Sequence, residues 1–273
     1  MKPLIRWTMG NVSEAGWECL SESTRLLPKV YPEFDYVICY NSIGQKSLSK
    51  TKDGLKRLKS FGIDLYEQKE EDLKIPHKFN KAKKVNNHCW KLCPARLNPD
   101  GHELWIDNDI VIMDRIPEVD DWLTKDVPII STSYGQEQHG RFQPNGMNNN
   151  CCAGFFGLPP NFDFQTKLLE GCNGIPLDGF DEQGLVVSII TKEEGWIPIH
   201  TWNLNQTGWF AKFTMECPGY HFIRLNTGTN SAWEHYKILS SPDPKICNSS
   251  EWMYSDIHLQ KKGTVIQQRF TAP

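Results

Sequence analysis

The chain has 273 residues and a formal net charge of −3, with no long basic block. This length suits one large domain or two small ones, and the apolar and aromatic content is enough to bury a sizeable core. The near-balanced charge gives no electrostatic footprint for nucleic acid or for an anionic membrane, so we expect neither as a partner.

Two further features of the composition bear on the compartment. The first ten residues lack the long apolar core of a secretion signal, and no later stretch is long enough to span a bilayer. The nine cysteines are an odd number and lie mostly in apolar runs, which is typical of buried free thiols rather than of a disulfide framework. We therefore expect a cytoplasmic protein with no integral membrane segment.

The first half of the chain alternates strand-like and helix-like stretches, which favours an α/β sheet sandwiched by helices. Short apolar runs indicate the strands, and apolar residues at three- and four-residue spacing between caps and breakers indicate the helices. In chain order we predict a strand at 3–9, a helix from a cap at Asn11 or Ser13 to Leu27 that Pro28 ends, a strand at 36–40, a helix at 47–61 closed by Gly62, a strand at 63–66, and a helix at 81–92 stopped by Pro94.

The most informative stretch is 103–113, where Asp107, Asn108 and Asp109 interrupt a run of apolar residues. We interpret the whole stretch as one buried strand, because the flanking residues leave little polar surface for a turn. Side chains two apart on a strand point the same way, so both carboxylates can converge on one ligand. Buried carboxylates need a compensating charge, and a hard divalent cation is the natural candidate.

The second half of the chain is less regular. The segment 134–150 is rich in Gly, Asn and Gln, and we expect a long surface loop of the kind that forms a lid or an acceptor-binding flap. A buried strand at 151–158 and helices at 159–170 and 180–190 follow. We predict a single domain over 1–240 and a C-terminal extension over 241–273.

Five motifs, in order along 3–236, carry a likeness to a known family. They are an Asp-x-Asp strand at 104–111, a basic segment upstream of it from Trp90-Lys91 to Arg96-Leu97, Cys152-Ala153-Gly154-Phe155-Phe156 in place of an Asn-Ala-Gly strand, Asp181-Glu182-Gln183-Gly184-Leu185 as an Asp-Gln segment, and Ile197-Pro198 with Trp202-Asn203 and His221 as closing elements. Taken together, they resemble the GT-A fold glycosyltransferases, and most closely glycosyltransferase family 8.

The resemblance implies an α/β GT-A fold with a central, mostly parallel sheet flanked by helices. It also implies metal-dependent transfer of a sugar from a nucleoside-diphosphate sugar, with a UDP-sugar favoured, to a hydroxyl of a glycan, protein or small-molecule acceptor, and it favours retention of configuration. Mn²⁺ or Mg²⁺ would be held by Asp107, Asp109 and His221 and would act as a Lewis acid on the leaving diphosphate. His235 competes with His221 as the third ligand, because the family's His-Gly-Lys-Pro-Trp motif is altered here.

The resemblance also names candidates for the donor and the reacting sugar. The donor-binding candidates are Lys91, Arg96, Asp107, Asn108, Ala153 and Gly154, and we add Thr8 because the end of the first strand lies at the carboxyl edge, where open α/β sheets bind ligands. The catalytic candidates are Asp181 and Glu182. In an inverting reaction one of these two acids would be the general base for the acceptor hydroxyl, whereas in a retaining one a carboxylate would orient sugar hydroxyls or stabilise positive charge.

Two other classes of protein remain as alternatives. A sugar-nucleotide nucleotidyltransferase has a related sheet and acidic metal ligands, but such enzymes carry a Gly-rich phosphate loop after the first strand. In this chain the corresponding residues, 9–12, include a single glycine. The other alternative is a sugar- or nucleotide-binding module without turnover, which only an assay separates from a transferase.

Overall fold

The structure is a computed structural model. It describes residues 1–10, 12–40, 48–59, 61–69, 72, 74–75, 87–134, 137, 139–142, 150–178, 181–207, 216–223, 225–226 and 230–240. The predicted extension at 241–273 lies outside these residues. Across the described ranges, none of the helices combines the length and the apolar character that a bilayer crossing requires.

A seven-stranded sheet forms the centre of the molecule, with the strand order β3-β2-β1-β4-β7-β6-β8. The strands are β1 (Leu4–Met9), β2 (Asp35–Tyr40), β3 (Asp64–Glu67), β4 (Glu103–Asp107), β6 (Ile129–Thr132), β7 (Cys151–Leu158) and β8 (Ile197–Ile199). Of these seven, β7 alone runs against its neighbours, and the other neighbouring pairs are parallel. The expectation of a central, mostly parallel sheet is confirmed.

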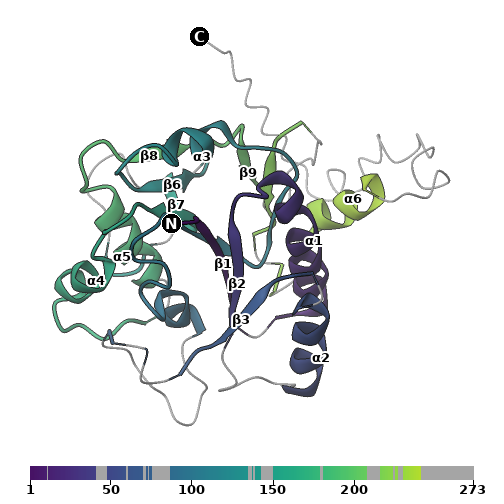
Figure 1. Cartoon of the computed structure of the whole chain (residues 1–273), viewed down its shortest axis with the longest axis horizontal. Helices are drawn as coiled ribbons and strands as arrows, with labels where there is room; N and C mark the ends of the chain where they lie inside the picture. The colour runs from purple at the N-terminus through teal and green to yellow at the C-terminus, as the bar shows by residue number, and fades with distance from the viewer. Residues whose placement is uncertain are drawn as a thin grey trace, which may run out of the picture.

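Helices cover both faces of this sheet (Figure 1). Helices α1 (Glu14–Val30) and α2 (Leu48–Lys59) lie on one side, and α4 (Phe164–Cys172) and α5 (Asp181–Ile190) lie on the other. The short helix α3 (Pro117–Trp122) precedes β6, and α6 (Ser231–Leu239) packs beside α1, where the Tyr236 hydroxyl donates to Glu22 at 2.7 Å. The predicted layering of helix, sheet and helix is therefore present.

Each face of the sheet has its own apolar core. Ile5, Trp7 and Leu104 belong to the core beneath α1 and α2, and Trp105 belongs to the core beneath α4 and α5. Because side chains alternate along a strand, the even-numbered side chains of β1 and the odd-numbered ones of β4 share the α5 side. Asp107, at the end of β4, thus faces the same side of the sheet as α5.

A second sheet of three strands joins distant parts of the chain. It has the order β5-β10-β9, with β5 (Ile110–Ile112), β9 (Leu204–Gln206) and β10 (Gly219–His221). Strand β10 is antiparallel to β5 and parallel to β9, and its last residue, His221, lies opposite Ile110. The predicted single strand at 103–113 is therefore wrong: β4 ends at Asp107, the chain turns through 108–109, and β5 enters the second sheet.

Several helix boundaries also differ from the prediction, three of them for a visible structural reason or in helix type. Helix α1 begins after Ser13, whose Oγ accepts from the Gly16 N–H at 3.0 Å, but it passes through Pro28 to Val30, because the Tyr31 N–H still reaches the Leu27 carbonyl at 2.8 Å. Helix α4 begins at Phe164 rather than at 159, since the Asp163 carboxylate caps it. The described end of the predicted helix at 81–92 is the 3₁₀ helix η2 (Asn87–Leu92).

Candidate functional site

Three potential metal ligands come together at the carboxyl ends of the parallel strands. Asp107 ends β4, Asp109 lies in the turn that follows, and His221 ends β10. One ligand atom from each of the three side chains lies within 4.8 Å of the others, and His221 Nε2 is 3.3 Å from Asp109 Oδ1. The carboxylates thus converge through a turn between two sheets and not through alternation along one strand.

Backbone contacts fix this cluster from two sides. The Phe222 N–H donates to the Asp109 carbonyl at 2.8 Å, which holds β10 against the turn. On the β7 side, a Cβ built at Gly154 would lie 2.5 Å from His221 Cε1 and 3.2 Å from Asp107 Oδ2. Residue 154 must therefore be glycine for the imidazole and the carboxylate to approach this closely.

Two of the three side chains in this cluster are largely shielded from solvent. Only 8% of Asp109 and 6% of His221 is exposed to solvent. Burial disfavours charge on His221, but the Asp109 carboxylate outweighs burial and raises the pKa of the imidazole well above its ordinary value. Burial raises the pKa of the Asp107 carboxyl, and the Lys91 ammonium, which acts in the opposite direction, does not cancel this effect. Two carboxylates and an imidazole at this spacing fit a divalent cation such as Mn²⁺ or Mg²⁺.

Lys91, in the last turn of η2, points at this cluster. Its Nζ lies 2.8 Å from Asp107 Oδ1 and 3.0 Å from Oδ2, and it also donates to the Ala153 carbonyl at 3.2 Å. Burial lowers the pKa of Lys91, but the nearby carboxylates of Asp107 and Glu182 raise it further, so the net shift is upward. Lys91 and the 153–154 backbone thus lie together with Asp107.

Two other donor-site candidates lie at the same edge. Thr8 on β1 is the register partner of Asp107 on β4, and among the described residues its Oγ1 is buried with no hydrogen-bond partner. Asn108, in the turn, exchanges two long hydrogen bonds of 3.5 and 3.3 Å with Asn226. Asn226 in turn accepts from the Ser13 N–H at 3.2 Å, so Asn108 ties the turn to the start of α1.

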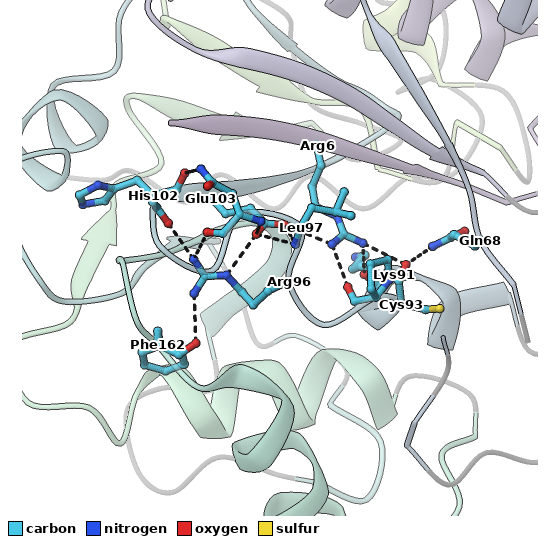
Figure 2. Close-up of polar contacts among 12 residues, drawn as sticks. Arg6, Gln68, Lys91, Cys93, Arg96, Leu97, His102, Glu103 and Phe162 are labelled. Atoms are coloured by element: carbon cyan, nitrogen blue, oxygen red, sulfur yellow. Dashed lines mark hydrogen bonds and ion pairs between the residues drawn. The ribbon is translucent and has the colours of Figure 1, made fainter. Parts of the chain in front are cut away.

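Arg96 does not belong to this group. Its guanidinium lies beside Glu103, at the opposite end of β4 from Asp107 (Figure 2). All five of its N–H donors meet protein acceptors, namely Glu103 Oε2 and the carbonyls of Pro159, Phe162, Asn98 and Gly101, at 2.8–3.1 Å. A guanidinium has no sixth donor to offer to a diphosphate. The prediction of Arg96 as a donor ligand is wrong, and its role is to hold the loop before β4.

The two catalytic candidates differ in their surroundings. The Asp181 carboxylate accepts from the Arg141 backbone N–H and the Asp178 N–H, both at 2.8 Å, and from the Arg141 guanidinium through Nε at 2.9 Å and through Nη2. Burial raises the pKa of Asp181, but these donors outweigh burial and lower it overall. Glu182 is 3% exposed, and its charge contributes to the raised pKa of Lys91. Asp181 is thus an anchor for residues 139–142, and Glu182 is a buried acid whose charge acts on Lys91.

Several features of the site were not predicted from the sequence. Arg141 and Asn226 both lie in irregular polar segments, where no periodicity marks a buried contact. The Cys152 Sγ lies 3.8 Å from Gln183 Oε1, a contact between two of the sequence motifs that the sequence did not predict. His235, the competing third ligand, is exposed on α6 and is not among the clustered ligand atoms, whereas His221 is.

Comparison with known proteins gives structural likeness only. No family model matches the chain, and no curated protein matches it by sequence. The galactosyltransferase LgtC, solved with donor and acceptor sugar analogs, is similar with a TM-score of 0.54 at 12% identity, covering 92% of this chain and 99% of LgtC. Mouse xyloside xylosyltransferase 1 gives 0.51 at 11% identity, covering 83% and 99%. The glycosyltransferase GlyE of Streptococcus pneumoniae TIGR4 gives 0.51 at 14% identity, covering 93% and 63%. The chain therefore has the GT-A fold found in these glycosyltransferases.

Proposed function

We propose that the protein is a metal-dependent glycosyltransferase that moves a sugar from a nucleoside-diphosphate sugar, with UDP-sugars favoured, to a hydroxyl acceptor. The observation that carries the proposal is the convergence of Asp107, Asp109 and His221 at the carboxyl edge of the sheet. Open α/β sheets bind ligands at this edge, and the fold is shared with glycosyltransferases. The likeness of the fold is independent of the motifs read from the sequence, and the clustering shows that residues from two of those motifs lie close together.

The chemistry required is stabilisation of a leaving diphosphate. Asp107, Asp109 and His221 would hold Mn²⁺ or Mg²⁺, which supplies Lewis acidity to the diphosphate oxygens when it is bound. The Lys91 ammonium adds a second positive charge at the same place, and the buried Thr8 hydroxyl offers a hydrogen bond at the end of β1. The backbone at 153–154 is close enough to Asp107 to contact a sugar that is attached to the diphosphate.

For the reacting sugar we favour Glu182 over Asp181. Asp181 already accepts four hydrogen bonds from Arg141 and Asp178, so it is poorly placed to accept a proton from an acceptor hydroxyl. Glu182 is the next residue along α5, and its charge is among those that raise the pKa of Lys91. In a retaining transfer this carboxylate would orient sugar hydroxyls or stabilise positive charge at the anomeric carbon.

The proposal is tested by thermal unfolding with UDP-, GDP- and CMP-sugars, with and without Mn²⁺ or Mg²⁺. A donor at a hundred times its Kd stabilises the folded state by about 2.7 kcal/mol, which gives a clear shift in Tm. We expect the shift only when the metal is present, and we expect Asp109→Ala to abolish it. A metal-independent shift that persists in Asp109→Ala would contradict the proposed site.

Turnover distinguishes the alternatives once a donor is found. Release of UDP together with a glycoside product, followed by NMR, indicates transfer, and the configuration of the product's anomeric carbon reports retention or inversion. Release of pyrophosphate from a nucleoside triphosphate and a sugar phosphate would instead indicate a nucleotidyltransferase. Metal-dependent binding without any product would indicate a binding module.

A further inference from the structure

The Lys91 ammonium already pairs with the Asp107 carboxylate, which is the group that a bound metal cation would also contact. It contacts both oxygens of the Asp107 carboxylate, at 2.8 and 3.0 Å, with the Lys91 side chain 13% exposed and the Asp107 side chain 26% exposed. At this level of exposure solvent weakens the ion pair only partly. The chain therefore carries its own counter-charge for one of its two metal-binding carboxylates.

The backbone beneath Lys91 is held in place by buried side chains (Figure 2). The Arg6 guanidinium, which pairs with Glu103 at 3.2 Å, donates to the Cys93 carbonyl at 3.1 Å and to the Lys91 carbonyl at 3.5 Å. The Gln68 amide donates to the Trp90 carbonyl at 2.7 Å and to that of Cys93. The end of η2 is thus fixed from two directions, so that Lys91 can leave Asp107 only by a movement of its side chain.

We propose that Lys91 and a divalent cation compete for Asp107, and that the diphosphate of the donor relieves this competition by accepting the displaced ammonium. A unit charge a few ångströms from a divalent cation repels it strongly in a partly buried site. Metal alone therefore binds weakly, because its binding separates Lys91 from Asp107 without giving the ammonium another partner. With a nucleoside diphosphate present, the ammonium moves to the phosphate oxygens and the metal takes Asp107.

This inference rests on the proposed function in one respect, namely that the donor carries a diphosphate. It makes Lys91 a coupling residue between two ligands, a role distinct from that of a simple donor contact. By linkage, a diphosphate that tightens metal binding through Lys91 is itself bound more tightly by the same factor when metal is present.

The first experiment measures Mn²⁺ affinity without nucleotide, by electron paramagnetic resonance of free Mn²⁺. We expect Lys91→Met to bind Mn²⁺ roughly tenfold more tightly than the wild type, or tighter still, because the competing charge is gone. Lys91→Arg, which keeps the charge, should remain within about threefold of the wild type. Lys125→Met is the matched control, since Lys125 belongs to an exposed pair with Asp121 and its loss should leave Mn²⁺ affinity unchanged.

The second experiment adds UDP and compares the tightening of Mn²⁺ binding in each variant. The tightening should be several-fold smaller in Lys91→Met than in the wild type, because direct contact between metal and phosphate remains but the relief of competition is lost. Lys91→Gln repeats both measurements with a side chain that can still donate to the Ala153 carbonyl, should Lys91→Met fold poorly.

The outcomes separate this inference from the proposed function. Unchanged or weaker Mn²⁺ binding by both Lys91→Met and Lys91→Gln, each folded by circular dichroism, overturns the competition. If Asp109→Ala binds Mn²⁺ as well as the wild type does, the metal site itself is wrong. If Mn²⁺ binding behaves as expected but no sugar donor is turned over, the competition stands and the transferase proposal fails.

Discussion

Gly154→Ala is a sharp test of the site's geometry, because it adds one carbon between two of the proposed metal ligands. The new Cβ would lie 2.5 Å from His221 Cε1, 3.1 Å from His221 Nδ1 and 3.2 Å from Asp107 Oδ2. Carbon atoms pack best at about 3.5–4.0 Å, so the imidazole must move by about 1 Å. Overpacking of this kind costs about 1–3 kcal/mol, and every 1.4 kcal/mol is about tenfold in affinity.

The strain must appear either as lost metal affinity or as lost stability. We expect Mn²⁺ binding, measured by calorimetry, to weaken about tenfold to a hundredfold if His221 is pushed aside, and the free energy of unfolding in urea to fall by about 1–3 kcal/mol if it is not. Gly171→Ala on α4 is the control, because its Cβ would meet mainly the end of the flexible Leu185 side chain and alanine favours a helix. A Gly154→Ala protein with both quantities unchanged would refute the arrangement of the site.

Two further predictions concern charges away from the ligands. Two buried guanidinium groups, those of Arg6 and Arg96, pair with Glu103, and among the described residues it is the only carboxylate that pairs with either of them. Glu103→Gln should therefore lower the free energy of unfolding in urea by about 3–5 kcal/mol. Glu33→Gln, in an exposed pair, should lower it by less than about 1 kcal/mol, and equal losses would contradict the buried network. Because the folded pKa of Asp181 is lowered, its contribution to stability is present above the unfolded pKa and is lost as pH falls through the folded one. Arg141→Ala should therefore flatten the acid limb of stability against pH, and an unchanged limb would show that the pairing is unimportant.

The sequence predicted those parts of the fold that local patterns encode. The strands predicted at 3–9, 36–40 and 151–158 are apolar runs bounded by breakers. The bounds of each differ by no more than two residues from those of an observed strand. Ser13 caps the start of α1 through its side chain, and Gly62, at φ +79°, follows the end of α2 at Lys59, two residues before the predicted end at 61.

The misplaced features depend on contacts between distant segments. The apolar residues 110–112 look like a continuation of β4, but they pair with β10, a segment more than a hundred residues later in the chain. Arg96 carries the same charge whether it meets a diphosphate or Glu103, and only the fold decides between them. Asp181 and Glu182 are adjacent acids at a helix start, and Arg141, from a loop without periodicity, separates their roles.

The pairing of β5 with β10 has a consequence for how the protein matures. Asp107 and Asp109 are made early in synthesis, but the imidazole that completes the cluster arrives only with β10. If a metal binds there as proposed, it would bind at a late stage of folding, since ligands contributed by remote segments do not exist as a set in the unfolded chain. A ribosome-bound chain that ends before residue 219 would contain the two acids without the imidazole, so the proposed three-ligand site would form only after β10 has been synthesised.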